Sequence, residues 1–274
     1  MDDNAGRFYI DDGVMREAGQ PVDMGSGNAA MIYEVIRIID GIPLFFEDHY
    51  IRMCSSFQAI GNVCRIGASE LKEQIHKIAE ANENTNCNIK FITFAEGGHQ
   101  RTLGYISKSH YPTQEEISNG VPVGLLSLER ENPNIKLLDH NYKKRINEIK
   151  SQRGLYEVFL VDREGNVTEG GTSNIFFVKG EKIITAPEEK VLKGITRMHV
   201  IETCKSAGFE VIEVSIPADR LGGADGVFLS GTSPNVLPVS SIDDRKYPSA
   251  KHPIVNTIRT AFDARIKEYL TMNR

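Results

Sequence analysis

The chain has 274 residues, of which 40% are hydrophobic, and its formal net charge is -5. This hydrophobic fraction is enough for the core of one large domain or of two ordinary ones. Acidic and basic residues are interspersed, so no basic stripe is available to neutralise nucleic-acid phosphates. No apolar run approaches the roughly 20 residues of a membrane span, and Met1-Asp2-Asp3 does not begin a signal peptide. We therefore expect a soluble, cytoplasmic protein without nucleic-acid or membrane partners.

The metal-binding residue types form no recognisable cluster. The seven histidines are scattered, and the cysteines show neither C-x-x-C pairing nor metal-ligand spacing. The four cysteines are Cys54, Cys64, Cys87 and Cys204. A domain of this size does not need disulfides, so we expect reduced thiols and no metal.

The first half of the chain mixes strands with amphipathic helices. Apolar segments predict strands at 8–10, 32–39 and 89–94. An Asp40-Gly41 turn predicts a hairpin whose second strand is 44–46. A helix is expected from Glu47 to Gly61, and Ser69 is the expected cap of a second helix.

The composition of the chain changes between 117 and 133, where glycines and prolines punctuate a short apolar run. We place the domain junction there, with an N-terminal α+β domain at 1–118, a linker at 119–132 and a C-terminal domain at 133–274. A polar helix at about 138–151 and a closing amphipathic helix are expected in the second domain. Its predicted strands are 156–161, 209–214 and 227–229, and paired segments around 167–178 and 182–185 are expected to complete a meander.

Three segments combine small residues, hydroxyls and charge in a way that a core does not require: 168–174 (TEGGTSN), 193–197 (KGITR) and 230–235 (SGTSPN). In the second, Gly194 precedes a predicted helix whose first turn exposes the N–H groups of Ile195 and Thr196, which is a natural anion site. The alternative is that Gly194 makes a tight turn and Thr196 caps the helix. Gly231-Thr232 could likewise be an ordinary turn.

Taken together, these residues resemble the class IV aminotransferases, which are fold type IV enzymes dependent on pyridoxal 5′-phosphate (PLP). The family includes branched-chain and D-amino acid aminotransferases and aminodeoxychorismate lyases. The matching pieces cover most of the chain in the family's order: Tyr33-Glu34-Val35, Asp40-Gly41, His49-Tyr50-Ile51-Arg52, Lys136, Val167-Thr168-Glu169-Gly170, Ser173-Asn174, 192–197, Gly231-Thr232 and Pro238-Val239. The resemblance implies an α+β fold with a small N-terminal α/β domain and a larger C-terminal domain that contains a β-barrel-like sheet.

The resemblance implies that Lys136, 20 residues before Tyr156, is the lysine that forms the Schiff base with PLP. Once substrate displaces it, its amine would move a proton between the substrate Cα and the cofactor's C4′. Lys143, Lys144 and Lys150 lie nearby and are the alternatives, although an arbitrary lysine is usually a solvated surface charge. The spacing favours Lys136.

The other site residues follow from the same resemblance. Glu169 would pair with the pyridine nitrogen, and Arg52 would bind the phosphate unless it only forms a surface salt bridge. His49 is expected to serve structure. The remaining cofactor-binding positions are Ser173, Asn174, Gly194, Ile195, Thr196, Gly231 and Thr232, and the substrate-binding positions are Tyr33, Thr172 and Ser233. Tyr33 could instead be a core tyrosine with a satisfied hydroxyl.

The chain departs from the family's pattern at three places. Ala29-Ala30-Met31 stands where a Gly-Asp-Gly is usual, and Asp139 stands where the lysine motif often has Asn. Many members carry a carboxylate-binding arginine in the strand near Phe94, whereas residues 95–99 here are AEGGH, and Arg101 is the nearest substitute. These departures affect substrate identity more than cofactor chemistry.

The sequence therefore predicts a PLP-dependent aminotransferase that moves an amino group between a small amino acid and a 2-keto acid. A homodimer is expected, because in enzymes resembling this one a neighbouring subunit completes the mouth of the pocket. Two alternatives stay open. An aminodeoxychorismate lyase would use Lys136 and Glu169 to form 4-aminobenzoate and pyruvate, and a PLP-binding homologue without turnover would explain the missing Gly-Asp-Gly and arginine.

Overall fold

The computed structural model describes residues 3–19, 22, 29–96 and 99–274. Gly97 and Gly98, in the segment 95–99 that differs from the family's pattern, lie outside the described residues. The chain divides into two compact units. Unit 1 consists of Met1–His110, Ile135–Leu138 and Glu268–Arg274, and unit 2 consists of Tyr111–Asn134 and Asp139–Lys267. The predicted boundaries at 118 and 133 stay a prediction.

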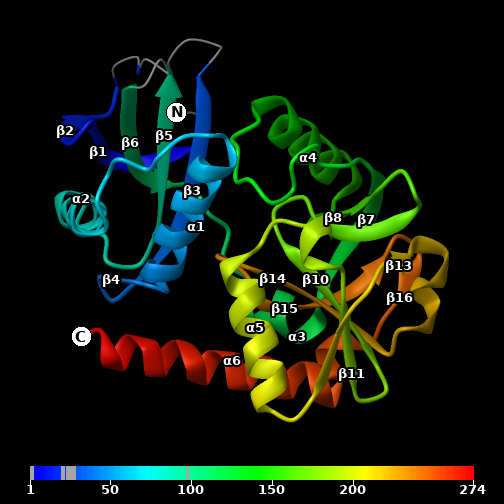
Figure 1. The fold of residues 1–274 in the computed structure, drawn as a ribbon. Helices are drawn as coiled ribbons and strands as arrows, with labels where there is room; N and C mark the ends of the chain where they lie inside the picture. The colour runs from blue at the N-terminus through cyan, green and yellow to red at the C-terminus, as the bar shows by residue number, and fades with distance from the viewer. Residues whose placement is uncertain (1–2, 20–21, 23–28, 97–98) are drawn as a thin grey trace. The chain divides into compact units, whose positions relative to one another are not determined.

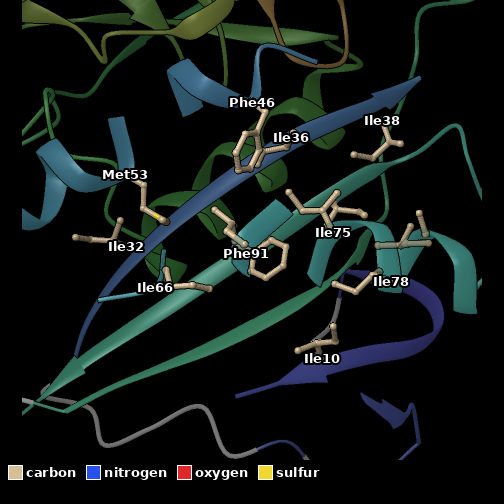
Figure 2. Packing of buried hydrophobic residues seen from close by; sticks show 14 of the residues in the cluster. Ile10, Ile32, Ile36, Ile38, Phe46, Met53, Ile66, Ile75, Ile78 and Phe91 are labelled. Atoms are coloured by element: carbon tan, nitrogen blue, oxygen red, sulfur yellow. The ribbon is translucent and has the colours of Figure 1, made fainter. Parts of the chain in front are cut away.

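Unit 1 is built on a six-stranded antiparallel sheet with the order β2-β1-β6-β5-β3-β4 (Figure 1). Its strands are β1 (Asn4–Asp11), β2 (Val14–Glu17), β3 (Ala30–Ile39), β4 (Ile42–Pro43), β5 (Asn88–Glu96) and β6 (His99–Ser107). Its helices are α1 (Phe46–Ala59) and α2 (Ala68–Ala81). Strand residues such as Ile36 and Phe91 pack against helix residues such as Met53 and Ile75 in one apolar core (Figure 2). The alternation of buried and less buried residues along β3 fits a strand with two different faces.

Most predicted elements of unit 1 are present, with shifted boundaries. The hairpin turn at Asp40-Gly41 is confirmed, and both residues have the positive φ that a tight turn between β3 and β4 requires. The predicted strand at 44–46 is wrong, because Phe45 adopts a left-handed conformation (φ 52°) and α1 begins at the next residue. The cap predicted at Ser69 is also wrong: Gly67 is the N-cap of α2.

Unit 2 is built on a ten-stranded mixed sheet that curls into a half-barrel, with the order β12-β11-β10-β14-β15-β7-β8-β9-β13 and β16 beside β15 (Figure 1). Its strands are β7 (Val121–Ser127), β8 (Glu157–Val161), β9 (Asn166–Gly170), β10 (Asn174–Lys179), β11 (Lys182–Thr185), β12 (Glu210–Glu213), β13 (Ile216–Pro217), β14 (Gly226–Gly231), β15 (Asn235–Ile242) and β16 (Arg245–Lys246). β7 lies inside the predicted linker at 119–132 and pairs with β8 and β15 in parallel.

The helical segments of unit 2 are α3 (Gln114–Asn119), α4 (His140–Arg153), α5 (Ile195–Ser206), η1 (Glu188–Lys190), η2 (Ala218–Gly223) and η3 (Ser249–Lys251), and α6 (Pro253–Met272) runs from unit 2 into unit 1. The polar helix predicted at 138–151 is α4, which begins where the Asp139 side chain accepts a hydrogen bond from the Tyr142 amide (2.9 Å). No helix in the described part of the chain is long and apolar enough to cross a membrane.

Candidate active site

In unit 1, the backbone at Lys136 is held against β3. The amide of Tyr33 donates to the Lys136 carbonyl (3.1 Å), and the amide of Leu138 donates to the Met31 carbonyl (2.8 Å). Segment 135–138 therefore behaves as a short additional strand of unit 1, although the chain on both sides of it belongs to unit 2.

The structure brings together two of the predicted site residues, Lys136 and Tyr33. The Lys136 ammonium lies 4.6 Å from the centre of the Tyr33 ring, and the ammonium of Lys90 lies 5.4 Å from the same centre. Lys90 is buried and forms an ion pair with Asp3 (3.1 Å). Tyr33 therefore contacts two cations through its ring, an arrangement that the quadrupole of an aromatic ring favours.

Arg52 lies in a buried network with Glu34 and His49. Its Nε and Nη2 donate to the two oxygens of Glu34 at 2.8 and 2.6 Å, and Nδ1 of His49 lies 2.7 Å from Oε2. Burial alone would raise the pKa of Glu34, but the charge and hydrogen bonds of Arg52 lower it to about 2. Burial lowers the pKa of His49 against the pull of Glu34, which favours its neutral form. The salt bridge considered for Arg52 thus exists, but in the interior of unit 1 rather than on its surface.

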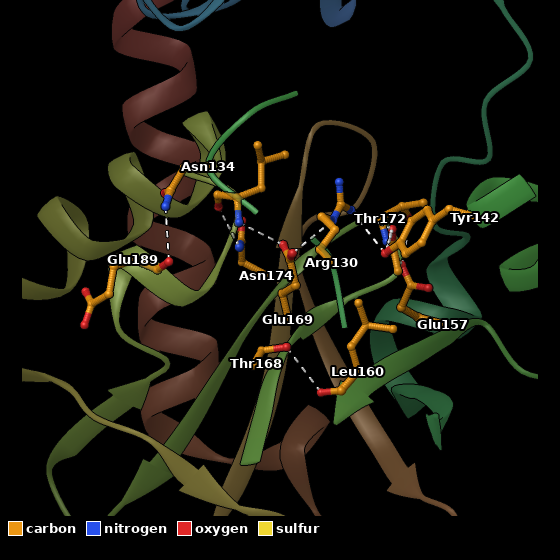
Figure 3. A network of polar contacts seen from close by, with 12 residues as sticks. Arg130, Asn134, Tyr142, Glu157, Leu160, Thr168, Glu169, Thr172, Asn174 and Glu189 are labelled. Carbon is orange, nitrogen blue, oxygen red and sulfur yellow. Dashed lines mark hydrogen bonds and ion pairs between the residues drawn. The ribbon is translucent and has the colours of Figure 1, made fainter. Parts of the chain in front are cut away.

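In unit 2, Glu169 near the end of β9 is only 2% exposed (Figure 3). Its Oε2 accepts a hydrogen bond from the Leu192 amide (3.2 Å), and its Oε1 lies 3.1 Å from Nε of Arg130. The second contact is an ion pair rather than an aligned hydrogen bond. The predicted pyridine partner is therefore a buried carboxylate with a cation beside it.

Arg130 is held over the ring of Tyr142, with the guanidinium carbon 4.7 Å from the ring centre (Figure 3). Its Nη2 donates to the Tyr142 hydroxyl (3.2 Å) and to the Gly171 carbonyl (3.3 Å), and the Tyr142 hydroxyl also donates to that carbonyl (3.1 Å). Burial raises the pKa of Tyr142 far above neutral, so its hydroxyl keeps its proton. Arg130 is thus oriented by the Tyr142 ring, the Tyr142 hydroxyl and the Gly171 carbonyl, as well as by Glu169.

Two predicted site residues, Thr172 and Ser173, bind a second buried carboxylate. Oε2 of Glu157 accepts hydrogen bonds from the Thr172 amide (3.0 Å), the Thr172 hydroxyl (2.6 Å) and the Ser173 hydroxyl (3.3 Å). Its Oε1 accepts from the Val158 amide (2.9 Å). Glu157 therefore fixes the turn that follows β9.

Helix α5 begins as the sequence predicts, but its N-terminus is not capped by Thr196. Gly194 is the N-cap residue, and no side chain caps the helix. The φ of Gly194 is -63°, so glycine is not needed for its backbone conformation. It is needed because a Cβ would lie 2.1 Å from Oδ1 of Asn174, whose side-chain amide donates to the Leu192 carbonyl (3.0 Å). Because no side chain caps α5, its first amides remain available to an anion.

Segment 230–235 begins on β14, the strand that pairs with β10. Ser230 on β14 pairs with Asn174 on β10, and Gly231 pairs with Asn235 across the β14–β15 hairpin. Thr232 and Ser233 lie in the loop of this hairpin. The Ser230 hydroxyl is buried and has no hydrogen-bond partner among the described residues. The structure thus brings Asn174, Gly194 and the 230–233 segment together.

Each unit, taken by itself, contains residue types that fit part of PLP. Unit 1 offers a lysine amine and an arginine, and unit 2 offers a buried carboxylate, an uncapped helix N-terminus and the buried Ser230 hydroxyl. These are the groups that an aldehyde, a phosphate and a pyridinium nitrogen require.

The sequence interpretation missed Arg130, and it gave no role to Glu157. A glutamate inside the apolar strand 156–161 is a usable signal, because a buried carboxylate needs donors. Arg130 stands in a polar stretch and carries no such signal. Arg101, considered as a substitute for the missing substrate arginine, binds both carboxylate oxygens of Asp11, at 2.6 and 2.7 Å.

The comparisons with known proteins agree with this interpretation. Residues 31–242 match the family described as amino-transferase class IV. A D-alanine aminotransferase of Bacillus licheniformis is 30% identical over 243 residues, 84% of this chain and 85% of the relative. An aminodeoxychorismate lyase of Bacillus subtilis is 22% identical over 282 residues, 96% of both chains. The crystal structure of a branched-chain amino acid aminotransferase from Thermobaculum terrenum in its PLP form has a TM-score of 0.81 at 23% identity, covering 97% of this chain and 95% of that one.

The expected fold is confirmed by the structural likeness, and the expected enzyme class and its PLP cofactor are confirmed by the family. A match over most of the chain, together with a relative at 30% identity, shows that this chain belongs to the class IV aminotransferase family.

Proposed function

We propose that Lys136 carries the cofactor and that the enzyme exchanges an amino group between a small amino acid and a 2-keto acid. One observation carries the choice of lysine. The backbone of Lys136 is hydrogen-bonded to β3 and its amine lies at the Tyr33 ring, whereas the alternatives lie on α4. There Lys144 is exposed and 3.8 Å from Glu148, and Lys150 is paired with Glu157 at 3.7 Å. A reacting amine needs a fixed position, and a solvated helix lysine does not have one.

When bound, PLP supplies an electron sink for the bond that breaks at the substrate Cα. The Lys136 amine removes a proton from the substrate Cα and returns it to the C4′ atom of the cofactor. The buried Glu169 carboxylate holds a positive charge at the pyridine nitrogen. Both roles depend on groups whose surroundings the fold fixes.

In unit 1, Arg52 is the residue proposed to bind phosphate, and in unit 2 the N-terminus of α5 and the hydroxyls around it are proposed for phosphate binding. Arg52 offers five N–H groups, of which Nε and Nη2 bind Glu34, so its guanidinium is fixed in direction before any ligand arrives. The proposed contacts in unit 2 are the amides of Ile195 and Thr196 after Gly194 and the hydroxyl of Thr232. Ser173, Asn174 and Gly231 are assigned to the shape of this region.

Tyr33, Thr172 and Ser233 are proposed to contact the substrate. Relatives with the names of D-alanine and branched-chain aminotransferases support a small aliphatic amino acid of either hand. The likeness to aminodeoxychorismate lyase supports that reaction as the second candidate. A homodimer and a cytoplasmic location belong to the same proposal, the latter supported by four thiols that form no disulfide.

The decisive test is to reduce the holoenzyme with borohydride and to map the labelled lysine by peptide mass. We expect a pyridoxyl group on Lys136 and a loss of at least about 10³-fold in kcat for Lys136→Ala, with Lys143→Ala as the matched control near wild type. A label on Lys143 or Lys150 would overturn the assignment.

Substrate class is then tested with an amino acid alone. A transaminase converts the cofactor to its aminated form without an acceptor, whereas a lyase releases pyruvate from aminodeoxychorismate. A protein that does neither would overturn both candidates. Sedimentation of the active enzyme tests the dimer.

A further inference from the structure

Glu169 is the carboxylate of unit 2 that the proposed function places against the cofactor, and its surroundings are unusual for such a group. Only 2% of the residue is exposed, and an ionised carboxylate at that depth is strongly disfavoured unless a cation or several donors stabilise it. The Leu192 amide supplies one hydrogen bond to Oε2. At the other oxygen, Oε1, the guanidinium of Arg130 lies 3.1 Å away.

Arg130 is well placed to stay charged and in one position. Its side chain is only 16% exposed, and its Nε is buried beside Glu169. The Tyr142 ring and hydroxyl contact the guanidinium (Figure 3). The Gly171 carbonyl accepts a hydrogen bond from its Nη2. Because these three contacts are neutral, they orient the guanidinium without offsetting its charge, and that charge acts on Glu169.

The other titratable groups of the network do not replace Arg130. Tyr142 on α4 remains protonated at neutral pH. Glu157 on β8 is surrounded by the Thr172 and Ser173 donors, and Lys150 lies 3.7 Å from its Oε1. The cation that acts on Glu169 from this side is therefore Arg130.

We propose that Arg130 is a positioning residue, which keeps the buried carboxylate of Glu169 ionised and in one orientation so that it can stabilise a protonated pyridine nitrogen. The proposal rests on the proposed function, since it takes from there the role of Glu169. Arg130 acts through Glu169 and exchanges no proton with the substrate.

The sign of the effect follows from electrostatics. A cation within 4 to 6 Å lowers the pKa of a carboxyl by about 1 to 3 units, so its removal raises the pH at which Glu169 takes up a proton by a similar amount. A protonated Glu169 is neutral and no longer favours a positive charge on the pyridine nitrogen. Arg130→Met should therefore weaken PLP binding by about 10- to 100-fold and lower kcat by about 10- to 10³-fold.

The experiment measures the protonation of Glu169 directly, by the infrared carbonyl band of its acid form, across pH in the cofactor-free protein and in the holoenzyme. The band is identified by its absence in Glu169→Gln. Arg130→Met removes the charge and keeps an apolar side chain of similar length, and Arg130→Lys keeps the charge. Arg163→Met is the matched control, because it removes the same charge from an exposed position of unit 2.

We expect the midpoint of the band to rise by about 1 to 3 pH units in Arg130→Met, to stay close to wild type in Arg130→Lys, and not to move in Arg163→Met. An unchanged midpoint in Arg130→Met, or an equal shift in both methionine variants, would overturn the proposal. The proposed function fails separately: if Glu169→Gln leaves PLP affinity and rate unchanged, Glu169 has no role at the cofactor, whatever Arg130 does.

Discussion

Each unit of the molecule buries a glutamate beside an arginine, and the two pairs are built differently. In unit 1, both oxygens of Glu34 accept hydrogen bonds from Arg52, and His49 lies 2.7 Å from Oε2. In unit 2, Glu169 accepts an amide hydrogen bond on one oxygen and has Arg130 beside the other as an ion pair. The first carboxylate has aligned hydrogen bonds on both oxygens, whereas the second is held on one side by charge.

The difference in hydrogen bonding indicates which of the two buried carboxylates is structural. A carboxylate whose two oxygens both accept from fixed side chains gains stability from them and has little left to offer a substrate. A buried carboxylate that is held partly by charge carries an energetic cost that a ligand's donor can offset. We therefore interpret the Glu34 carboxylate as structural and the Glu169 carboxylate as the one that can still act on a ligand.

The largest effect expected from this comparison is on stability at Glu34. Glu34→Gln leaves Arg52 buried without its counterion, and we expect a loss of about 3 to 5 kcal/mol in the free energy of unfolding. Glu169→Gln should cost less than about 2 kcal/mol, because Arg130 keeps its contacts with Tyr142 and Gly171, yet it should lower kcat by about 10² to 10³-fold. Urea unfolding and steady-state kinetics on both variants measure the contrast, with the exposed Glu80→Gln as control. Equal stability losses at the two glutamates would break the comparison.

The second effect is the acid sensitivity of unit 1. Since the pKa of Glu34 falls from 4.5 to about 2 on folding, Glu34 contributes about 3 kcal/mol at neutral pH, and this contribution is lost as pH falls from 4.5 towards 2. His49 also has a lowered pKa, so its contribution begins to fall below pH 6.5. Hydrogen exchange of α1 peptides between pH 7 and pH 2 should show the loss of protection, and His49→Asn should flatten the part that begins just below pH 6.5. A pH-independent protection of α1 contradicts the assignment.

The smallest expected effect is on stability at Gly194, the N-cap residue of α5 in unit 2. Gly194 and Gly67 are both N-cap glycines with extended backbone, but a Cβ at Gly194 would meet Asn174 at 2.1 Å, whereas nothing lies within 4 Å of a Cβ at Gly67. We expect Gly67→Ala to cost less than about 1 kcal/mol and Gly194→Ala to cost about 1 to 3 kcal/mol, with weaker PLP binding. Thermal unfolding and PLP titration measure both. A neutral Gly194→Ala would show that Asn174 moves aside easily.

Local sequence patterns predicted the elements better than their ends. Strand 32–39 and the hairpin at Asp40-Gly41 were predictable because hydrophobic alternation and turn chemistry act over a few residues. The strand at 44–46 was predicted wrongly from an apolar run. Phe45 is in the left-handed conformation, which a phenylalanine rarely adopts and which the sequence does not indicate. β6 was missed because its first residues, His99 to Thr102, are polar although the residues from Leu103 to Ile106 are buried.

The candidate site was predictable where residue type and spacing repeat a family's order, and not where a contact depends on tertiary structure. Lys136 and Glu169 were singled out in this way, and their roles stay predictions. Arg130 could not be identified, because a guanidinium in a polar stretch resembles any surface arginine until the fold shows Tyr142 beneath it. The pairing of Arg52 with Glu34 was likewise invisible, since 18 residues separate them and they lie on different elements.

The placement of segment 135–138 limits how this enzyme can recombine with its relatives. The chain passes between the two units at 110–111, 134–135, 138–139 and 267–268, so neither unit is a continuous stretch. A crossover that exchanges residues 111–267 as one block would also import the donor's lysine segment, which must then pair with a β3 from the other parent. Such a chimera can therefore fold correctly only if the backbone pairing of Leu137 with Ile32 is preserved.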